Sequence, residues 1–133
     1  MKPRGGVSRG SKFIDLEGSI KVRSYVYLGT QEDSVANSGG FVGIMLQESF
    51  LGRSPVTLGR FVDHIEHVMK IGGEDLPALG SDYDGMITPP LSLPTPLAYP
   101  RIVDEMLKRK FSETAIRKFL GGNVLRVIEA VRG

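Results

Sequence analysis

The stretch Leu76-Pro-Ala-Leu-Gly-Ser-Asp-Tyr-Asp-Gly85 is the most informative part of this sequence. A short apolar run is followed within a few residues by two glycines and two carboxylates, a pattern typical of a buried strand that opens into a loop. In parallel α/β proteins, the loops at the carboxyl ends of the strands carry the chemistry. We therefore expect the functional site in this loop, with Asp82 and Asp84 as its first candidate residues.

A second strand and a long helix are predicted before this stretch. The run Phe41-Val-Gly-Ile-Met-Leu46 is continuously apolar, as expected of a strand covered on both faces. Thr57 is placed to cap the helix that follows, and Gly72 marks its end. The apolar positions of that helix recur at helical spacing and are Leu58, Phe61, Val62, Ile65, Val68 and Met69. A shorter helix is predicted from Thr30 to Asn37, where Asn37-Ser-Gly-Gly40 ends it.

The second half of the chain reads as a long loop and three helices. Five prolines lie in the loop from Pro89 to Pro100, which is too irregular for a simple connection and is typical of a lid or a wall. Pro100 suits the first turn of the next helix. We expect Ser112 to cap a short helix that ends at Gly121, and Asn123 to cap the last helix.

The first 29 residues give weaker signals. Residues 1–12 are glycine-rich and basic without periodicity, which predicts a flexible tail. The stretch Gly5-Gly-Val-Ser-Arg-Gly10 lacks the preceding strand and following helix that a phosphate-binding loop needs. A strand is predicted from Ser19 to Leu28 because Val, Tyr and Ile are frequent there.

Composition excludes several classes of protein. The chain has 133 residues, 41% of them hydrophobic and 24% charged, which is ordinary for one folded domain. A net charge of +2 does not predict a nucleic-acid surface, and no apolar run approaches the roughly 20 residues of a membrane span. The absence of cysteine excludes disulfides and thiolate zinc sites. No apolar signal segment begins the chain, so a cytoplasmic location is the default expectation.

From Thr30 onward, helices and strands alternate, which predicts an α/β fold with parallel strands joined by right-handed crossovers. Together with Val62-Asp-His-Ile-Glu-His67 and Phe119-Leu-Gly-Gly-Asn-Val-Leu-Arg-Val127, the opening stretch resembles the C-terminal portion of the renal (membrane) dipeptidase family of metallopeptidases. The resemblance runs from Thr30 to Val131.

The resemblance implies the C-terminal part of a (β/α)8 TIM barrel, incomplete in this chain. Gly39-Gly-Phe-Val-Gly-Ile44 is similar to the seventh strand of that barrel, Leu76 to Leu79 to the eighth, and Gly121-Gly-Asn-Val-Leu-Arg126 to the closing helix. A complete barrel takes about 250 residues, so this chain supplies about two or three of eight units. The expected division is an unmatched segment at 1–29 and a partial dipeptidase-like domain at 30–133.

Members of the family hydrolyse dipeptides at a pair of zinc ions, and most of the metal ligands lie on strands that this chain does not match. Asp82 is similar to the family's carboxylate that holds the substrate amino group or takes a proton. Its competing interpretation is a strand-end residue that accepts backbone hydrogen bonds in a turn. For Asp84, we expect turn chemistry or orientation of its neighbours, with direct substrate contact as the alternative. Gly80 and Gly85 are expected to allow close backbone approach or a positive φ.

Other polar residues are not assigned to the site. His64 and His67 lie three residues apart on the predicted helix, and helical geometry directs the pair away from the core and from any strand end, so no metal ligand is predicted. Asn123 is interpreted as a helix cap and Arg126 as a contact from helix to barrel. Glu48 and Arg53 are also expected to lie on the active face, but no role is assigned to them.

Two hypotheses follow. The chain is either a dipeptidase-family polypeptide that binds no zinc tightly and is inactive alone, or a non-catalytic remnant that associates with the missing half of the barrel or with copies of itself. Unpaired sheet edges and uncovered apolar faces favour such association.

Overall fold

The computed structural model describes residues 13–14, 20–22, 25–27 and 35–133. The predicted flexible tail and the predicted cap Thr30 lie outside these ranges. The elements in chain order are β1 (Phe13–Ile14), β2 (Ile20–Val22), β3 (Tyr25–Tyr27), β4 (Val42–Met45), α2 (Glu48–Leu51), α3 (Leu58–Gly72), β5 (Pro77–Ser81), the short 3-10 helix η1 (Pro96–Ala98), α4 (Tyr99–Lys108), α5 (Glu113–Arg117), the kinked helical segment η2 (Lys118–Gly122) and α6 (Asn123–Arg132).

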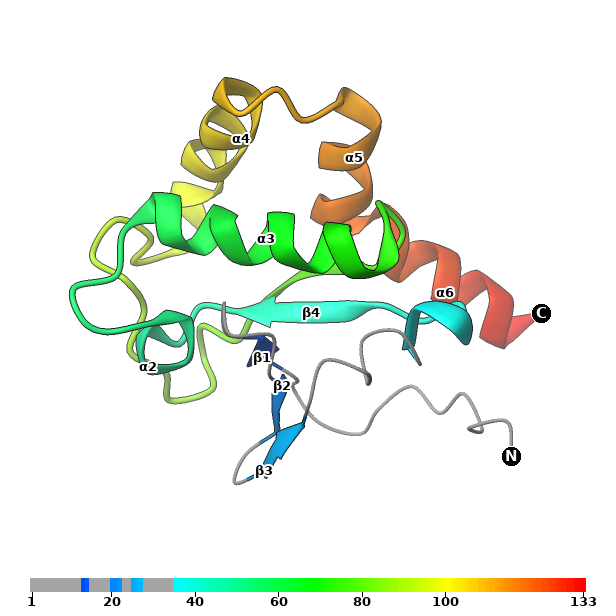
Figure 1. Ribbon diagram of the computed structural model, residues 1–133, viewed down its shortest axis with the longest axis horizontal. Coiled ribbons are helices and arrows are strands. Elements are labelled where there is room, and N and C mark those ends of the chain that lie inside the picture. Colours follow the sequence, from blue (N-terminus) through cyan, green and yellow to red (C-terminus); the bar gives the residue numbers. More distant parts are fainter. Residues whose placement is uncertain (1–12, 15–19, 23–24, 28–34) are drawn as a thin grey trace.

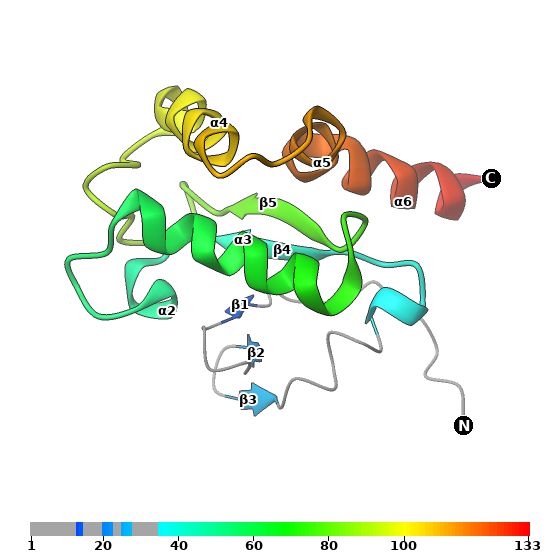
Figure 2. The ribbon, with the colours of Figure 1, turned by 45° about the horizontal axis from the view of Figure 1, so that its top comes forward.

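Two parallel strands form the centre of the fold. β4 pairs with β5 in the register Val42 to Pro77 and Ile44 to Leu79, which confirms the predicted α/β fold with parallel strands. The crossover between them contains α3, and α4 and α5 lie on one side of β4 while β1 lies on the other (Figures 1 and 2). Among the described residues, no helix has the length and apolarity needed to cross a membrane.

The first three strands form a separate antiparallel sheet, in the order β1, β2, β3. The single strand predicted from Ser19 to Leu28 is therefore wrong. Two short strands occupy this range, and Lys21 of β2 pairs with Val26 of β3. Their closeness in sequence favours antiparallel pairing, because a short connection joins antiparallel strands readily.

Local signals place α3 where the sequence predicted it. The hydroxyl oxygen of Thr57 accepts a hydrogen bond from the Arg60 amide at 3.1 Å, so the predicted cap is confirmed. At the other end, Gly73 has a φ of 77°, which glycine adopts without steric cost. The ring of Phe61 meets that of Phe119 edge to face at 6.4 Å, which joins α3 to η2 in the core.

Arg109 joins α4 to α3. Its guanidinium donates to the Asp63 carboxylate at 2.5 Å and to the Gly59 carbonyl at 2.8 Å, and it also pairs with Glu105 at 3.0 Å. The side chain of Arg109 is only 23% exposed, so these contacts are better shielded from water than an ordinary surface pair.

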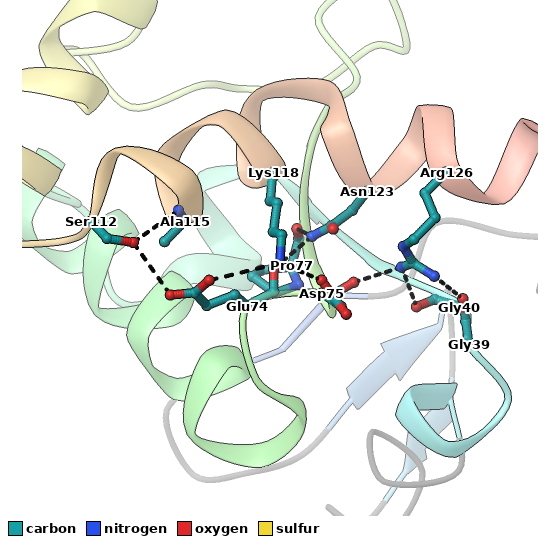
Figure 3. Close-up of polar contacts among 10 residues, drawn as sticks. All are labelled: Gly39, Gly40, Glu74, Asp75, Pro77, Ser112, Ala115, Lys118, Asn123 and Arg126. Atoms are coloured by element: carbon teal, nitrogen blue, oxygen red, sulfur yellow. Dashed lines mark hydrogen bonds and ion pairs between the residues drawn. The ribbon is translucent and has the colours of Figure 1, made fainter.

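Polar contacts hold η2 and α6 against the segment that leads into β5 (Figure 3). The Lys118 ammonium lies 2.8 Å from the Asp75 carboxylate, and this hydrogen bond holds the pKa of Asp75 below its usual range. Arg126 donates to the carbonyls of Gly39 and Asp75, at 2.6 and 2.9 Å. Arg126 therefore contacts the segments that lead into both strands and ties together the amino ends of β4 and β5.

The interpretation of Asn123 as a helix cap is wrong. Its backbone is helical, with φ −67° and ψ −39°, because the break between the helices falls at Gly121 (φ 172°, ψ −20°) and the last helix has already begun at Asn123. The side chain is buried, and its Nδ2 donates to the carbonyls of Glu74 at 2.8 Å and Pro77 at 2.9 Å. Asn123 therefore satisfies two backbone acceptors of the segment that enters β5.

We predict that Asn123→Ala lowers the free energy of unfolding by about 2 to 4 kcal/mol, because it leaves two carbonyl groups without their donor in a buried place. Urea unfolding would measure the loss. Arg117→Ala is the matched control, since Arg117 and its partner Glu113 are 77% and 78% exposed. A change within about 0.5 kcal/mol is expected for the control. An equally small change for Asn123→Ala would contradict the structural role.

Candidate functional site

The loop that follows β5 begins with a strained backbone. Four non-glycine residues in the described part of the chain have a positive φ. Three of them are the last residue of β5 or lie in this loop: Ser81 at 36°, Asp82 at 76° and Met86 at 61°. Such conformations persist where the surrounding structure imposes them, and they cluster at functional sites. The strain therefore singles out the loop that the sequence also indicated.

The two candidate carboxylates differ in exposure. Asp82 is half-buried and follows directly on the last residue of β5, whereas Asp84 is exposed. Neither carboxylate has a side-chain hydrogen bond or ion pair among the described residues. The structure thus presents Asp82 at the carboxyl end of a parallel strand, where the sequence placed it, and directs Asp84 toward solvent.

The strand itself approaches its neighbour closely at this end. A Cβ atom on Gly80 would lie 2.9 Å from the carbonyl carbon of Gly43 and 3.1 Å from the backbone of Ile44. The predicted close approach at Gly80 is therefore confirmed, while its φ is not in the left-handed region. The register also shifts here, because Met45 pairs with Ser81 and skips Gly80.

Hydrogen bonds join the carboxyl ends of β4 and β5. The Leu46 amide donates to the Ser81 carbonyl at 3.0 Å. Beyond the strands, the Thr88 amide donates to the Gln47 side-chain oxygen at 2.6 Å, and the Thr88 carbonyl accepts from the Glu48 amide at 2.9 Å. The sequence carried no signal for the tie between Gln47 and Thr88, which are 41 residues apart. This tie closes the loop that contains Asp82.

Glu48 has a structural role in the same region. Its carboxylate accepts a hydrogen bond from the Val56 amide at 3.2 Å, which holds the loop between α2 and α3. Arg53 lies in that loop and is exposed. Glu48 therefore stabilises this loop, and neither residue is assigned a role in the site.

Tyr83 fixes the proline-rich segment beside Asp82. Its hydroxyl donates to the Leu93 carbonyl at 2.9 Å, and its ring lies 6.0 Å from that of Tyr99 at the start of α4. Burial raises the pKa of Tyr83 to about 12. The residue that directly follows Asp82 is therefore tied to the segment from Pro89 to Pro100 and to the start of α4.

His64 faces the core, contrary to the prediction that both histidines point away from it. It is fully buried, and its Nε2 donates to the Leu51 carbonyl at 2.7 Å. The error arose because the covering segment, α2 and its loop, was not predicted from sequence. His67 is half-buried on the same helix.

The described residues do not by themselves form a zinc site. Among them, no group of three or more histidine, cysteine, aspartate or glutamate side chains is placed to hold a metal ion. His64, one of the two histidines of the chain, donates to a backbone carbonyl within the core.

Comparison with protein families identifies the class of this chain. Residues 32–133 match the family described as "Membrane dipeptidase (Peptidase family M19)". The chain therefore belongs to the membrane dipeptidase family of metallopeptidases, as the motifs predicted. The match begins two residues after Thr30, where the predicted resemblance began.

Curated relatives are similar over part of their length. "Dipeptidase verJ" of Clonostachys rogersoniana is 34% identical over 96 residues, which cover 72% of this chain and 24% of that protein. "Dipeptidase ataJ" of Aspergillus terreus is 40% identical over 75 residues, which cover 56% of this chain and 18% of that protein. The matched region thus spans a quarter or less of these relatives.

Solved structures agree with the family. One similar structure is a metallo peptidase from Rhodobacter sphaeroides, liganded with a phosphinate mimic of the dipeptide L-Ala-D-Ala. It superposes with a TM-score of 0.70 at 28% sequence identity, and the match covers 75% of this chain and 30% of the peptidase. An amidohydrolase from Pseudomonas aeruginosa gives a TM-score of 0.65 at 28% identity, covering 74% and 38%. The parallel α/β arrangement therefore recurs in about a third of each larger structure.

We predict that Tyr83→Phe weakens folding and flattens its dependence on alkaline pH. The pKa of Tyr83 is higher in the folded chain than in the unfolded chain, so its contribution is complete below about pH 10 and is lost as pH rises toward 12. Urea unfolding of both proteins from about pH 9 to 12 would measure the difference. A constant difference between the two proteins across this range would contradict the burial of the hydroxyl.

Proposed function

We propose that this chain contributes the final strands and the Asp82 carboxylate to a site that hydrolyses dipeptides, with zinc as the family's cofactor. The observation that carries the proposal is the position of Asp82, which is half-buried, strained in its backbone and located at the carboxyl end of β5. Membership in a metallopeptidase family and the dipeptide mimic bound by the Rhodobacter sphaeroides relative support it.

The proposed fold of the complete site is a (β/α)8 barrel in which β4 and β5 are the last two strands. The parallel pairing of these strands and the helical crossover between them support this arrangement. We also propose that residues 30–133 form the barrel-related domain and that residues 1–29 are a separate segment. The family match from residue 32 onward supports this division.

Asp82 has two chemical uses in such a site. A carboxylate accepts charge-assisted hydrogen bonds from an ammonium group, which would select dipeptides with a free amino terminus. It can also take a proton from the attacking water and pass it to the leaving amine. Asp84 is exposed, so its proposed role is to shape the turn, with substrate contact as the alternative.

The described residues form no metal cluster, so the other groups of the site must come from outside them. We therefore propose that the chain alone hydrolyses dipeptides slowly or not at all. The purified chain, supplied with zinc, should show no turnover above that of free zinc. Robust hydrolysis in proportion to bound metal would contradict this proposal.

The role of Asp82 is best tested in a complete relative whose matching C-terminal segment is replaced by residues 35–133. The chimera should hydrolyse dipeptides, and Asp82→Asn should lower kcat/KM by about 10²- to 10⁴-fold, as expected for loss of a proton-transfer or charge-recognition group. Glu113→Gln, which alters an exposed carboxylate on α5, is the matched control. Equal activity of the Asp82 variant and the control would contradict the proposal.

A second function, association with another chain, is favoured by the outer edge of β5. The Val42 amide donates to the Leu76 carbonyl, so alternate residues of β5 face β4, and the backbone of Pro77 and Leu79 faces away. Pro77 has no amide hydrogen, and Asn123 occupies its carbonyl. Within the part of the chain that the structure describes, the amide and carbonyl of Leu79 are therefore the groups on this edge that another strand would pair with.

An apolar groove adjoins this edge. It has a volume of about 470 Å³ and is lined by Leu79, Tyr99, Pro100, Val103, Asp104 and Leu120. An open strand edge beside an apolar groove favours association, because both features become covered in the complex.

We predict that the purified chain has a mass above 14.5 kDa in solution and that Leu120→Lys shifts it toward the monomer, since a charge in the groove opposes burial. Size-exclusion chromatography with light scattering would measure this. Leu97→Lys is the control, because Leu97 is 91% exposed and lies outside the groove. A monomer at every concentration would contradict association through this face.

A further inference from the structure

The Asp82 carboxylate lies directly against the backbone of Gly85. A Cβ atom at position 85 would lie 2.5 Å from the Cγ of Asp82 and 2.7 Å from its Oδ2, and closer still to Oδ1. All three distances are far below van der Waals contact, so the carboxylate occupies the space that a side chain at position 85 would need. The Asp82 side chain is therefore folded back over its own turn.

The backbone at Gly85 does not itself require glycine. Among the described residues, the glycines with a left-handed φ are Gly39, Gly52, Gly73 and Gly133, and Gly85 is not one of them. The turn is closed by a hydrogen bond from the Gly85 amide to the Asp82 carbonyl at 2.9 Å, which alanine would also make. The three atoms nearest to an added methyl group all belong to the Asp82 carboxylate, which is the movable end of a short side chain.

We infer that Gly85 is a positioning residue for Asp82. Because glycine has no side chain, the Asp82 carboxylate can occupy the space beside position 85, which we call its seat. This position sets the direction in which the carboxylate meets the substrate. The inference rests on the proposed function of Asp82. The strained φ values of Ser81 and Asp82 fix the backbone on one side of the carboxylate, and Gly85 leaves the space for it on the other. The same turn contains Asp84, which does not occupy the seat.

The seat can be tested on the 133-residue chain. In a carbon-detected NMR spectrum, the carboxyl signal of Asp82 should shift in Gly85→Ala, because the methyl group expels the carboxylate from its seat. Gly121→Ala is the matched control, since nothing lies within 4 Å of a Cβ atom at position 121, which is far along the chain from the turn. An unchanged Asp82 signal in Gly85→Ala would overturn the inference.

A double-mutant cycle covers the case in which Gly85→Ala folds less stably. If the only clash is with the carboxylate, the loss in unfolding temperature caused by Gly85→Ala should disappear in the Asp82→Ala background. An equal loss in both backgrounds would overturn the inference, because the clash would then involve the backbone.

Activity of the chimera separates this inference from the function on which it rests. Gly85→Ala should lower kcat/KM by about 10²-fold, as expected when a reacting group is displaced by about 1 Å. If Asp82→Asn abolishes hydrolysis while Gly85→Ala leaves it unchanged, the seat is refuted and the proposed function stands. In a further outcome, the NMR signal of Asp82 moves but neither Asp82→Asn nor Gly85→Ala affects hydrolysis. The proposed function then fails. The inferred role of Gly85 in directing Asp82 toward substrate is also overturned, although Gly85 still makes room for the carboxylate.

Discussion

The close parallel pairing of β4 and β5 is the constraint on which the rest of the structure depends. Gly80 lies close to the backbone of Gly43 across the pair, and a Cβ atom on Gly80 would meet the β4 backbone at 2.9 Å. This approach permits the register shift between Ile44 and Met45, after which the chain leaves β5 at Ser81. The position of Asp82 follows directly from that exit.

Separate groups of contacts hold the two ends of the strand pair. At the amino ends, Asn123 and Arg126 bind backbone carbonyls of the segments that enter the strands. At the carboxyl ends, Gln47 and Thr88 join the two outgoing loops. The first group stabilises the helices against the sheet, whereas the second shapes the loop that contains the candidate carboxylate. This separation is the one expected of parallel α/β proteins, in which stability and chemistry lie at opposite strand ends.

The sequence predicted those parts of the fold that local patterns encode. The apolar runs of β4 and β5 and the Thr57 cap of α3 all lie where the pattern indicated. The Ser112 cap is also confirmed, since its oxygen accepts from the Ala115 amide at 3.1 Å. The ordered motifs identified the family, because several short signals in one order are more specific than any one of them.

The errors concern residues whose role depends on distant partners. Asn123 follows two glycines and precedes an apolar helix, which is typical of a cap, yet its amide reaches carbonyls 46 and 49 residues away. His64 is buried because α2 and its loop cover it. The sequence of this segment has no periodic pattern from which its position over His64 could be predicted. The ties from Thr88 to Gln47 and from Tyr83 to Leu93 join loops, which have no repeating pattern to read.

The most direct measurement of the central claim is the pairing of β4 with β5 in solution. Nuclear Overhauser contacts between Gly43 and Ala78 and between Ile44 and Leu79 should be present, and the amides of Val42 and Leu46 should exchange slowly with solvent. Absence of these contacts, together with fast exchange at both amides, would contradict the account, because Asp82 would then have no strand end to occupy.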